Sequence, residues 1–213
     1  DLFQAGHKFF AKKTVSGQGK DVRCIENEEQ FAELQKQWHH DKYILQEAVR
    51  QHSFLSSINP NSVNTIRLVT LNDGESVKPL RAVLRCGTLR SGKVDNLHAG
   101  GVGIALNRDG ELTKYGYYVS GYGTKTDCHP DSGVIFEGIK IPFYEEAVEK
   151  ALQLYKMLYD ICAVGWDIAI TEEGPVFIEG NVSWGLDAIQ ICHGGIRKEW
   201  LELCQKRGIK IPK

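Results

Sequence analysis

The stretch GWDIAITEEGPVFIEGN, residues 165–181, determines the fold class of this chain. Two apolar runs flank the polar segment TEEG, and a glycine in such a segment is typical of a tight turn. The pattern predicts two antiparallel strands joined by that turn. Such a hairpin folds Asp167 back beside Glu179, and Asn181 shares a strand face with Glu179 because the two residues are two positions apart.

These three side chains bring oxygen atoms together at the end of otherwise apolar strands. Magnesium ions take oxygen ligands of this kind, commonly one or two carboxylates together with substrate phosphates. The sequence therefore predicts a Mg²⁺ site formed by Asp167, Glu179 and Asn181. A surface hairpin with incidental polar ends is the alternative interpretation.

A glycine-rich segment near the start of the chain, KTVSGQGK at 13–20, lies between two predicted strands at 7–12 and 22–25. Backbone N–H groups in such a turn can bind phosphate. The segment is not a Walker A loop, because Thr14 replaces its first glycine and Asp21 replaces its final Ser or Thr. A simple hairpin tip is the competing interpretation.

Three arginines lie within apolar, strand-like runs: Arg67 in one, Arg81 and Arg85 in the next. An arginine inside such a strand needs an anionic partner or a route to solvent. Guanidinium groups bind phosphate oxygens in pairs, so we expect Arg67 and Arg85 to bind a terminal phosphate or an acyl-phosphate. Structural salt bridges are the alternative, and for Arg81 the sequence favours neither interpretation.

The rest of the chain alternates apolar periodicity with turn signals. The segment NDGE at 72–75 is a strong hairpin turn, and Asn27 can cap a helix that follows it. We expect helices at 27–38, 142–160, 187–191 and 196–206, strands at 43–49, 63–71, 77–86 and 102–106, and a long loop at 115–133.

Bulk properties exclude several classes of protein. A formal net charge of −1 with mixed signs shows no signature of nucleic-acid binding, and no apolar stretch approaches the length of a membrane span. The six cysteines are scattered, which argues against a disulfide scaffold. We therefore expect a cytoplasmic protein with reduced thiols, and the oligomeric state is left open.

Taken in order along the chain, these features resemble the ATP-grasp superfamily, and most closely the sugar-transfer-associated ATP-grasp family. The matching segments are FFAK at 9–12 with its glycine-rich loop, YILQEAV at 43–49, NTIRL at 64–68, NLHAGGVG at 96–103, and Asp167 with EGN at 179–181. The resemblance spans the chain from about residue 9 to residue 190.

The resemblance implies an α+β fold of two lobes with the nucleotide between them. Residues 1–49 are then the remnant of the small nucleotide-binding lobe, and residues 50–213 are the larger catalytic lobe. The sequence begins with Asp1 rather than Met, and the resembled enzymes carry a pre-ATP-grasp domain before this point. We therefore expect weak ATP affinity from these residues alone, and a fragment that is inactive by itself is a further alternative interpretation.

The resemblance also implies ATP and Mg²⁺ as cofactors, and it assigns further site residues. These are Lys12, Ser16, Gly17, Gly19, Gln46, Glu47 and Val49 for the nucleotide, and Arg67, Arg85 and Asn96 for catalysis. A solvated lysine at a strand end and an edge-strand charge are the alternatives for Lys12 and Glu47. The glycines after Asn96 suggest close approach of the backbone to a ligand.

The implied reaction is that of an ATP-dependent ligase. A substrate carboxylate, small or linked to a sugar, becomes an acyl-phosphate, and an amine or similar nucleophile then displaces phosphate. The family resemblance points to polysaccharide or cell-surface biosynthesis. A kinase on the same fold and a nucleotide-binding module without catalysis are the alternatives. Product analysis separates the enzymes, because a ligase releases free phosphate and a kinase does not.

Overall fold

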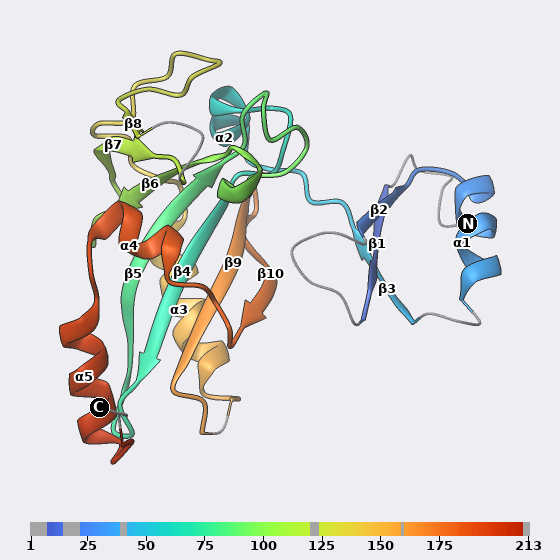
Figure 1. Cartoon of the computed structure of the whole chain (residues 1–213). Coiled ribbons are helices and arrows are strands. Elements are labelled where there is room, and N and C mark those ends of the chain that lie inside the picture. Colours follow the sequence, from blue (N-terminus) through green and yellow to red (C-terminus); the bar gives the residue numbers. More distant parts are fainter. Residues whose placement is uncertain (1–7, 15–21, 39–41, 120–123, 159, 211–213) are drawn as a thin grey trace. The chain divides into compact units, whose positions relative to one another are not determined.

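The computed structural model describes residues 8–14, 22–38, 42–119, 124–158 and 160–210. The chain divides into two compact units, Asp1–Arg50 and Gln51–Lys213 (Figure 1). This division falls one residue after the boundary expected from the sequence.

The first unit is an antiparallel sheet of three strands, in the order β2-β1-β3, with one helix packed on it. Its elements are β1 (Phe9–Lys13), β2 (Val22–Ile25), α1 (Glu28–Gln37) and β3 (Tyr43–Glu47). Leu34 of the helix packs against Ala11 and Tyr43 in a small buried core. The strand expected at 43–49 thus ends at Glu47.

Helix α1 begins where the sequence predicted, and its start is capped from both sides. The side chain of Asn27 accepts a hydrogen bond from Gln30 N at 2.9 Å, while the side chain of Gln30 accepts one from Glu26 N at 2.8 Å. The first bond satisfies a backbone donor that the first helical turn leaves without a partner, and the second ties the Gln30 side chain to the residue before the cap.

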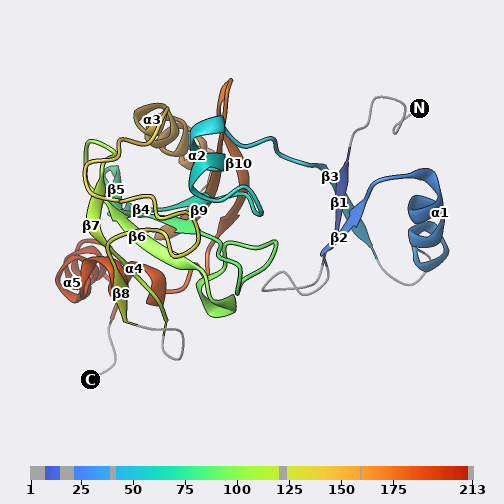
Figure 2. The same ribbon diagram turned by 90° about the horizontal axis from the view of Figure 1, so that it is seen from above.

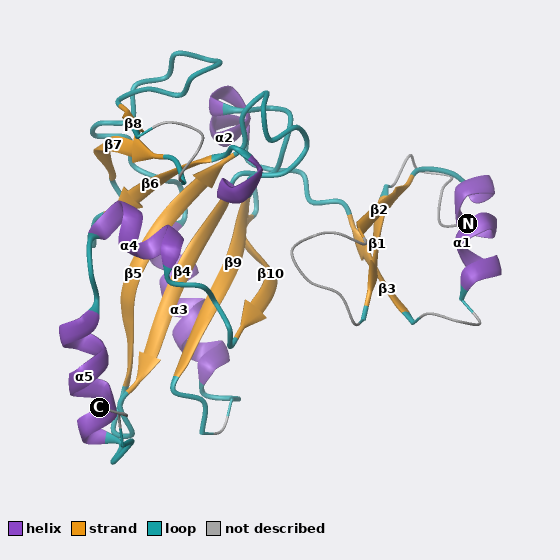
Figure 3. Cartoon of the chain, viewed as in Figure 1, coloured by secondary structure: helices purple, strands orange, loops and turns teal. Residues whose placement is uncertain are grey.

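The second unit is built on an antiparallel sheet of seven strands, in the order β10-β9-β4-β5-β6-β7-β8 (Figure 3). The strands are β4 (Thr65–Asn72), β5 (Val77–Cys86), β6 (Val102–Leu106), β7 (Leu112–Tyr117), β8 (Lys125–Thr126), β9 (Ala163–Thr171) and β10 (Gly174–Asn181). The predicted turn at 72–75 joins β4 to β5, as expected.

Helices cover both faces of this sheet, so the unit has three layers (Figure 2). They are α2 (Ser53–Ile58) and α3 (Tyr144–Tyr155) on one face, with α4 (Asp187–His193) and α5 (Arg197–Lys206) on the other. Each face has its own core. Leu55, Ala151 and Trp166 belong to the larger core, and Val83 and Ile189 belong to the smaller core.

Two sequence predictions about this unit are wrong in detail. The segment from residue 115 to residue 133 was expected to be a loop, but its first residues belong to strand β7 and it also contains the short strand β8. The helix expected to reach residue 160 ends at Tyr155, because Met157 and Leu158 make i→i−3 bonds. The Tyr155 hydroxyl donates to Ile161 O at 2.6 Å, which fixes this tighter turn.

Among the described residues, none of the helices combines the length and apolar character needed to cross a membrane. All six cysteines are described, and none of them forms a disulfide.

Candidate functional site

The candidate site lies on the sheet face that also packs against α4. The antiparallel register places Asp167 of β9 directly opposite Arg67 of β4, and Thr65 of β4 directly opposite Arg85 of β5. Residues directly opposite each other share a sheet face, and so do residues two apart on one strand. All four side chains therefore project from the same face.

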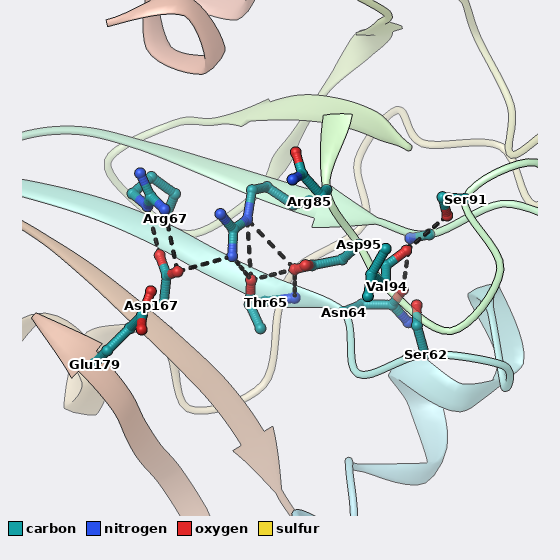
Figure 4. A network of polar contacts seen from close by, with 12 residues as sticks. Ser62, Asn64, Thr65, Arg67, Arg85, Ser91, Val94, Asp95, Asp167 and Glu179 are labelled. Carbon is teal, nitrogen blue, oxygen red and sulfur yellow. Dashed lines mark hydrogen bonds and ion pairs between the residues drawn. The ribbon is translucent and has the colours of Figure 1, made fainter. Parts of the chain in front are cut away.

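A bulge in β10 brings Glu179 to this face. Phe177 pairs with Ile168, but Glu179 pairs with Asp167, so one residue is inserted between the two pairs. Phe177 packs edge-on against Trp166 on the opposite face, with ring centroids 5.7 Å apart. Regular alternation would put Glu179 on the face of Phe177. The bulge instead turns Glu179 toward Asp167, as bulges beside functional sites often do (Figure 4).

Asp167 is the centre of a buried ion-pair network. Its side chain is 7% exposed and accepts hydrogen bonds from both arginines. Arg67 donates from Nε to Oδ1 at 2.5 Å and from Nη2 to Oδ2 at 3.1 Å, and Arg85 donates from Nη2 to Oδ2 at 3.0 Å. Arginines buried in an apolar sheet are stable here because they share this carboxylate.

Arg67 is also held by the chain beyond β10. Its Nη1 donates to the carbonyl oxygen of Trp184 at 2.5 Å. Trp184 comes this close to the sheet because Gly165 has no side chain, and a Cβ at Gly165 would lie 2.2 Å from Trp184 Cβ. Gly165 thus makes room for the segment that holds Arg67.

Two residues of the network were not predicted from the sequence. Arg85 donates from Nε and Nη2 to the Thr65 hydroxyl, at 3.1 and 2.6 Å, and its Nε lies 3.3 Å from Asp95 Oδ2. Thr65 donates from its backbone N–H and its hydroxyl to the same Asp95 oxygen (Figure 4). Thr65 belongs to the NTIRL segment and Asp95 precedes Asn96, so their positions beside predicted site residues were the available signal.

The electrostatics of the network differ from residue to residue. Burial would raise the pKa of Asp167, but the charges and hydrogen bonds of Arg85 and Arg67 hold that pKa below its usual value. Burial raises the pKa of Asp95, which Arg85 only partly offsets. Burial would lower the pKa of Arg85, yet the charges of Asp95 and Asp167 raise it.

The charges of this face favour a cation entering together with an anion. Arg67 and Arg85 are outnumbered by the carboxylates of Asp95, Asp167 and Glu179, which leaves one negative charge in excess when all are ionised. A polyphosphate alone would therefore meet no net positive charge from these five groups.

The donor set at the end of the hairpin fits a hard divalent cation. Asp167 and Glu179 are directly paired, and the Asn181 amide donates to Glu179 Oε1 at 3.0 Å on an exposed strand end. A cation would meet two carboxylates and one amide oxygen there. The described residues contain no group of three or more His, Cys, Asp or Glu that could hold a metal ion, so the candidate site here depends on the Asn181 amide as its third ligand. The ligand role of the three residues stays a prediction.

In the first unit, the predicted nucleotide residues separate onto two sheet faces. Lys12 pairs with Ile44 and lies two residues from Phe10, which pairs with Gln46, so Lys12 and Gln46 share a face. Glu47 lies on the other face, which packs against α1, and Val49 follows the end of the strand. Ser16, Gly17 and Gly19 lie outside the described residues.

Asn96 and the glycines after it have internal contacts. The Asn96 side chain accepts a hydrogen bond from His98 N at 3.0 Å and caps a short 3₁₀ turn. A Cβ at Gly101 would lie 2.8 Å from Asp95 O, and one at Gly103 would meet Leu97 and Cys192. The glycines therefore allow close approach of the chain to itself, where we had expected approach to a ligand.

Arg81 lies outside the network. It pairs with Glu199 of α5 at 2.6 Å, a half-exposed ion pair that attaches this helix to β5. Of the two interpretations left open for Arg81, the observed contact corresponds to a structural salt bridge.

A model of the family described as sugar-transfer associated ATP-grasp matches residues 7–213. No curated protein matches the chain significantly. The mixed α/β architecture with antiparallel sheets agrees with an ATP-grasp fold, and the match covers nearly the whole chain. The chain therefore belongs to the sugar-transfer associated ATP-grasp family.

Proposed function

We propose that this protein is an ATP- and Mg²⁺-dependent ligase that activates a substrate carboxylate as an acyl-phosphate. The observation that carries the proposal is the arrangement of Arg67, Arg85, Asp167 and Glu179 on one sheet face. Two guanidinium groups beside two acidic side chains suit a phosphate group that arrives with a divalent cation.

In this proposal each group has one task. Asp167, Glu179 and Asn181 hold Mg²⁺, which supplies neutralisation of the polyphosphate charge when bound. Arg67 and Arg85 bind oxygens of the terminal phosphate. Because Asp167 accepts hydrogen bonds from both arginines, it would hold a cation only by giving up part of these contacts.

The chemistry then needs no nucleophile from the protein. A carboxylate oxygen of the substrate attacks the γ-phosphorus and ADP leaves, and an amine attacks the acyl carbon and phosphate leaves. The arginines stabilise the charge on the transferring phosphoryl group. We propose a small or sugar-linked carboxylate as the substrate and a role in polysaccharide or cell-surface biosynthesis, supported by the family's association with sugar transfer.

The test is calorimetric titration with ATP in the presence and absence of Mg²⁺. We expect Mg²⁺-dependent binding that Glu179→Gln weakens about tenfold without loss of folding. Glu173→Gln is the matched control, because Glu173 lies in the turn of the same hairpin. Equal affinities for Glu179→Gln and the wild type would remove Glu179 from the site, and no Mg²⁺-dependent binding by the wild type would refute the proposal.

Product analysis tests the type of reaction. A ligase converts ATP, a carboxylate and an amine or hydroxyl nucleophile into ADP, free phosphate and an amide or ester. A phosphorylated product with no free phosphate would assign a kinase reaction instead.

A further inference from the structure

Asp95 and Thr65 form a small buried assembly beneath Arg85, and the proposed reaction gives neither of them a role. Asp95 comes from the segment between β5 and β6, whereas Thr65 lies on β4, so the two meet only in the folded unit. The Asp95 side chain is 14% exposed and Thr65 is 4% exposed. A buried carboxylate is costly unless it is paired and hydrogen-bonded.

The hydrogen bonds of this assembly form a chain in which Arg85 donates to Thr65 and Thr65 donates to Asp95. The Thr65 hydroxyl has a single proton, and it donates that proton to Asp95 Oδ2. Its lone pairs are then left to accept from Arg85 Nε and Nη2, at 3.1 and 2.6 Å. Asp95 thus fixes the hydroxyl in the orientation that receives Arg85, and it also faces Arg85 Nε directly at 3.3 Å.

As a result, both nitrogens along one edge of the Arg85 guanidinium have partners in the protein. Nε and Nη2 bind Thr65, Asp95 and Asp167, whereas Nη1 donates no hydrogen bond to any described residue (Figure 4). A planar guanidinium held along one edge has a fixed direction for its remaining nitrogen.

Neutralising Arg85 does not by itself require Asp95. Asp167 already supplies a carboxylate at 3.0 Å, so Asp95 is a second negative charge placed beside the same guanidinium. What Asp95 and Thr65 add is a defined orientation, because their contacts fix Nε, the atom that sets the plane of the group.

We propose that Asp95 and Thr65 are positioning residues that hold Arg85 so that Nη1 is presented to an anionic oxygen of the ligand. This inference rests on the proposed function, in which that oxygen belongs to the terminal phosphate of ATP. Neither residue touches the ligand. They act through Arg85, as supporting groups act on the residues that bind a ligand.

The first test examines Arg85 itself and needs no nucleotide. The ¹⁵Nε–Hε resonance of Arg85, assigned by its absence in Arg85→Lys, should exchange slowly with solvent in the wild type. Thr65→Val and Asp95→Asn should accelerate this exchange about tenfold or more, while Thr65→Ser, which retains the hydroxyl, should not. Unchanged exchange in folded Thr65→Val and Asp95→Asn would overturn the inference.

The second test measures the contribution of the terminal phosphate. Calorimetric titrations with Mg²⁺ and either ADP or β,γ-methylene ATP give the ratio of the two affinities. We expect Thr65→Val and Asp95→Asn to reduce the preference for the triphosphate by about tenfold, and Thr65→Ser to retain it. Asp131→Asn is the control, since Asp131 binds Leu89 N at 2.8 Å, away from Arg85.

The two tests separate the inference from the proposed function. A wild type that binds neither nucleotide refutes the proposed function, and the Arg85 resonance alone then decides whether Asp95 and Thr65 orient Arg85. The inference is refuted if the wild type prefers the triphosphate and the folded Thr65→Val and Asp95→Asn proteins keep the full preference. The proposed function would then still stand.

Discussion

Arg67 and Arg85 share one carboxylate, that of Asp167, and this sharing explains how three charged residues remain inside an apolar sheet. Each of them was expected at the site from its position in a strand, yet their mutual contacts were not. The contacts depend on the register between β4, β5 and β9, which joins residues about a hundred positions apart. Local sequence patterns predict which face a side chain takes, but not which distant side chain it meets.

The first prediction concerns the shape of the Arg85 side chain. Arg85→Lys should lower the rate of ADP release on the order of a hundredfold, because an ammonium group cannot bind Thr65, Asp167 and a phosphate in fixed directions. Affinity for ATP should fall less than this rate, by about tenfold. Arg81→Lys is the control, since Arg81 binds Glu199. An equal loss of rate in Arg81→Lys would contradict the assignment.

The second prediction concerns the space beside Arg67. Gly165→Ala would place a methyl group 2.2 Å from Trp184 Cβ, so the segment holding Arg67 would have to move. We expect the free energy of unfolding to fall by about 1–3 kcal/mol, measured by urea denaturation. Gly195→Ala should change it by less than about 0.5 kcal/mol, because a Cβ there would meet only Gln190 at 3.9 Å. A matching effect of both substitutions would show that crowding against Trp184 is not the cause.

Among the elements, strand β10 shows where sequence reasoning was right and where it was incomplete. The hairpin was predicted correctly from two apolar runs and a glycine turn, because these signals are local. The bulge before Glu179 was not predicted. Phe177 and Glu179 are two residues apart and would share a face in a regular strand, yet Phe177 packs in the core and Glu179 faces Asp167. The inserted residue is needed because Phe177 must face the core while Glu179 must face Asp167, and a local sequence pattern does not contain both requirements.

The third prediction concerns the attachment of α5 to the turn between β4 and β5. Lys206 Nζ donates to Asp73 Oδ2 at 2.9 Å, and Ser76 and Glu75 donate from their backbone N–H groups to the other oxygen. These bonds hold the pKa of Asp73 well below its usual value. An acid with a lowered folded pKa contributes stability above its unfolded pKa of 3.8, and that contribution declines as the pH falls below it.

Lys206→Met should therefore lower the Tm near pH 6, and its difference from the wild type should shrink as the pH falls below about 4. Thermal denaturation followed by circular dichroism at several pH values measures this difference. Lys93→Met is the control, since Lys93 is an exposed lysine in a turn between β5 and β6. A difference that stays constant between pH 6 and pH 3 would show that Asp73 is not the partner that matters.

At the level of the whole molecule, the chain consists of two units with separate cores. The core of residues 1–50 is built around Ala11, Leu34 and Tyr43, and both cores of the second unit use only residues beyond 50. The sequence predicts a boundary after residue 49, because the motifs assigned to each lobe are contiguous along the chain. It could not indicate the separation of Lys12 and Glu47 onto opposite faces, which depends on how β3 pairs with β1.

The fourth prediction follows from these separate cores. Residues 51–213 expressed alone should fold, because every buried side chain of the two cores and every contact of the Arg67–Asp167–Arg85 network lies within them. Their Tm should match the main transition of the full chain within about 4 °C, the shift that ~1 kcal/mol causes in a domain of this size. Calorimetry of both proteins makes the comparison. A larger loss would mean that residues 1–50 stabilise the second unit through contacts beyond its own cores, and the two units would then have to be treated as one cooperative structure.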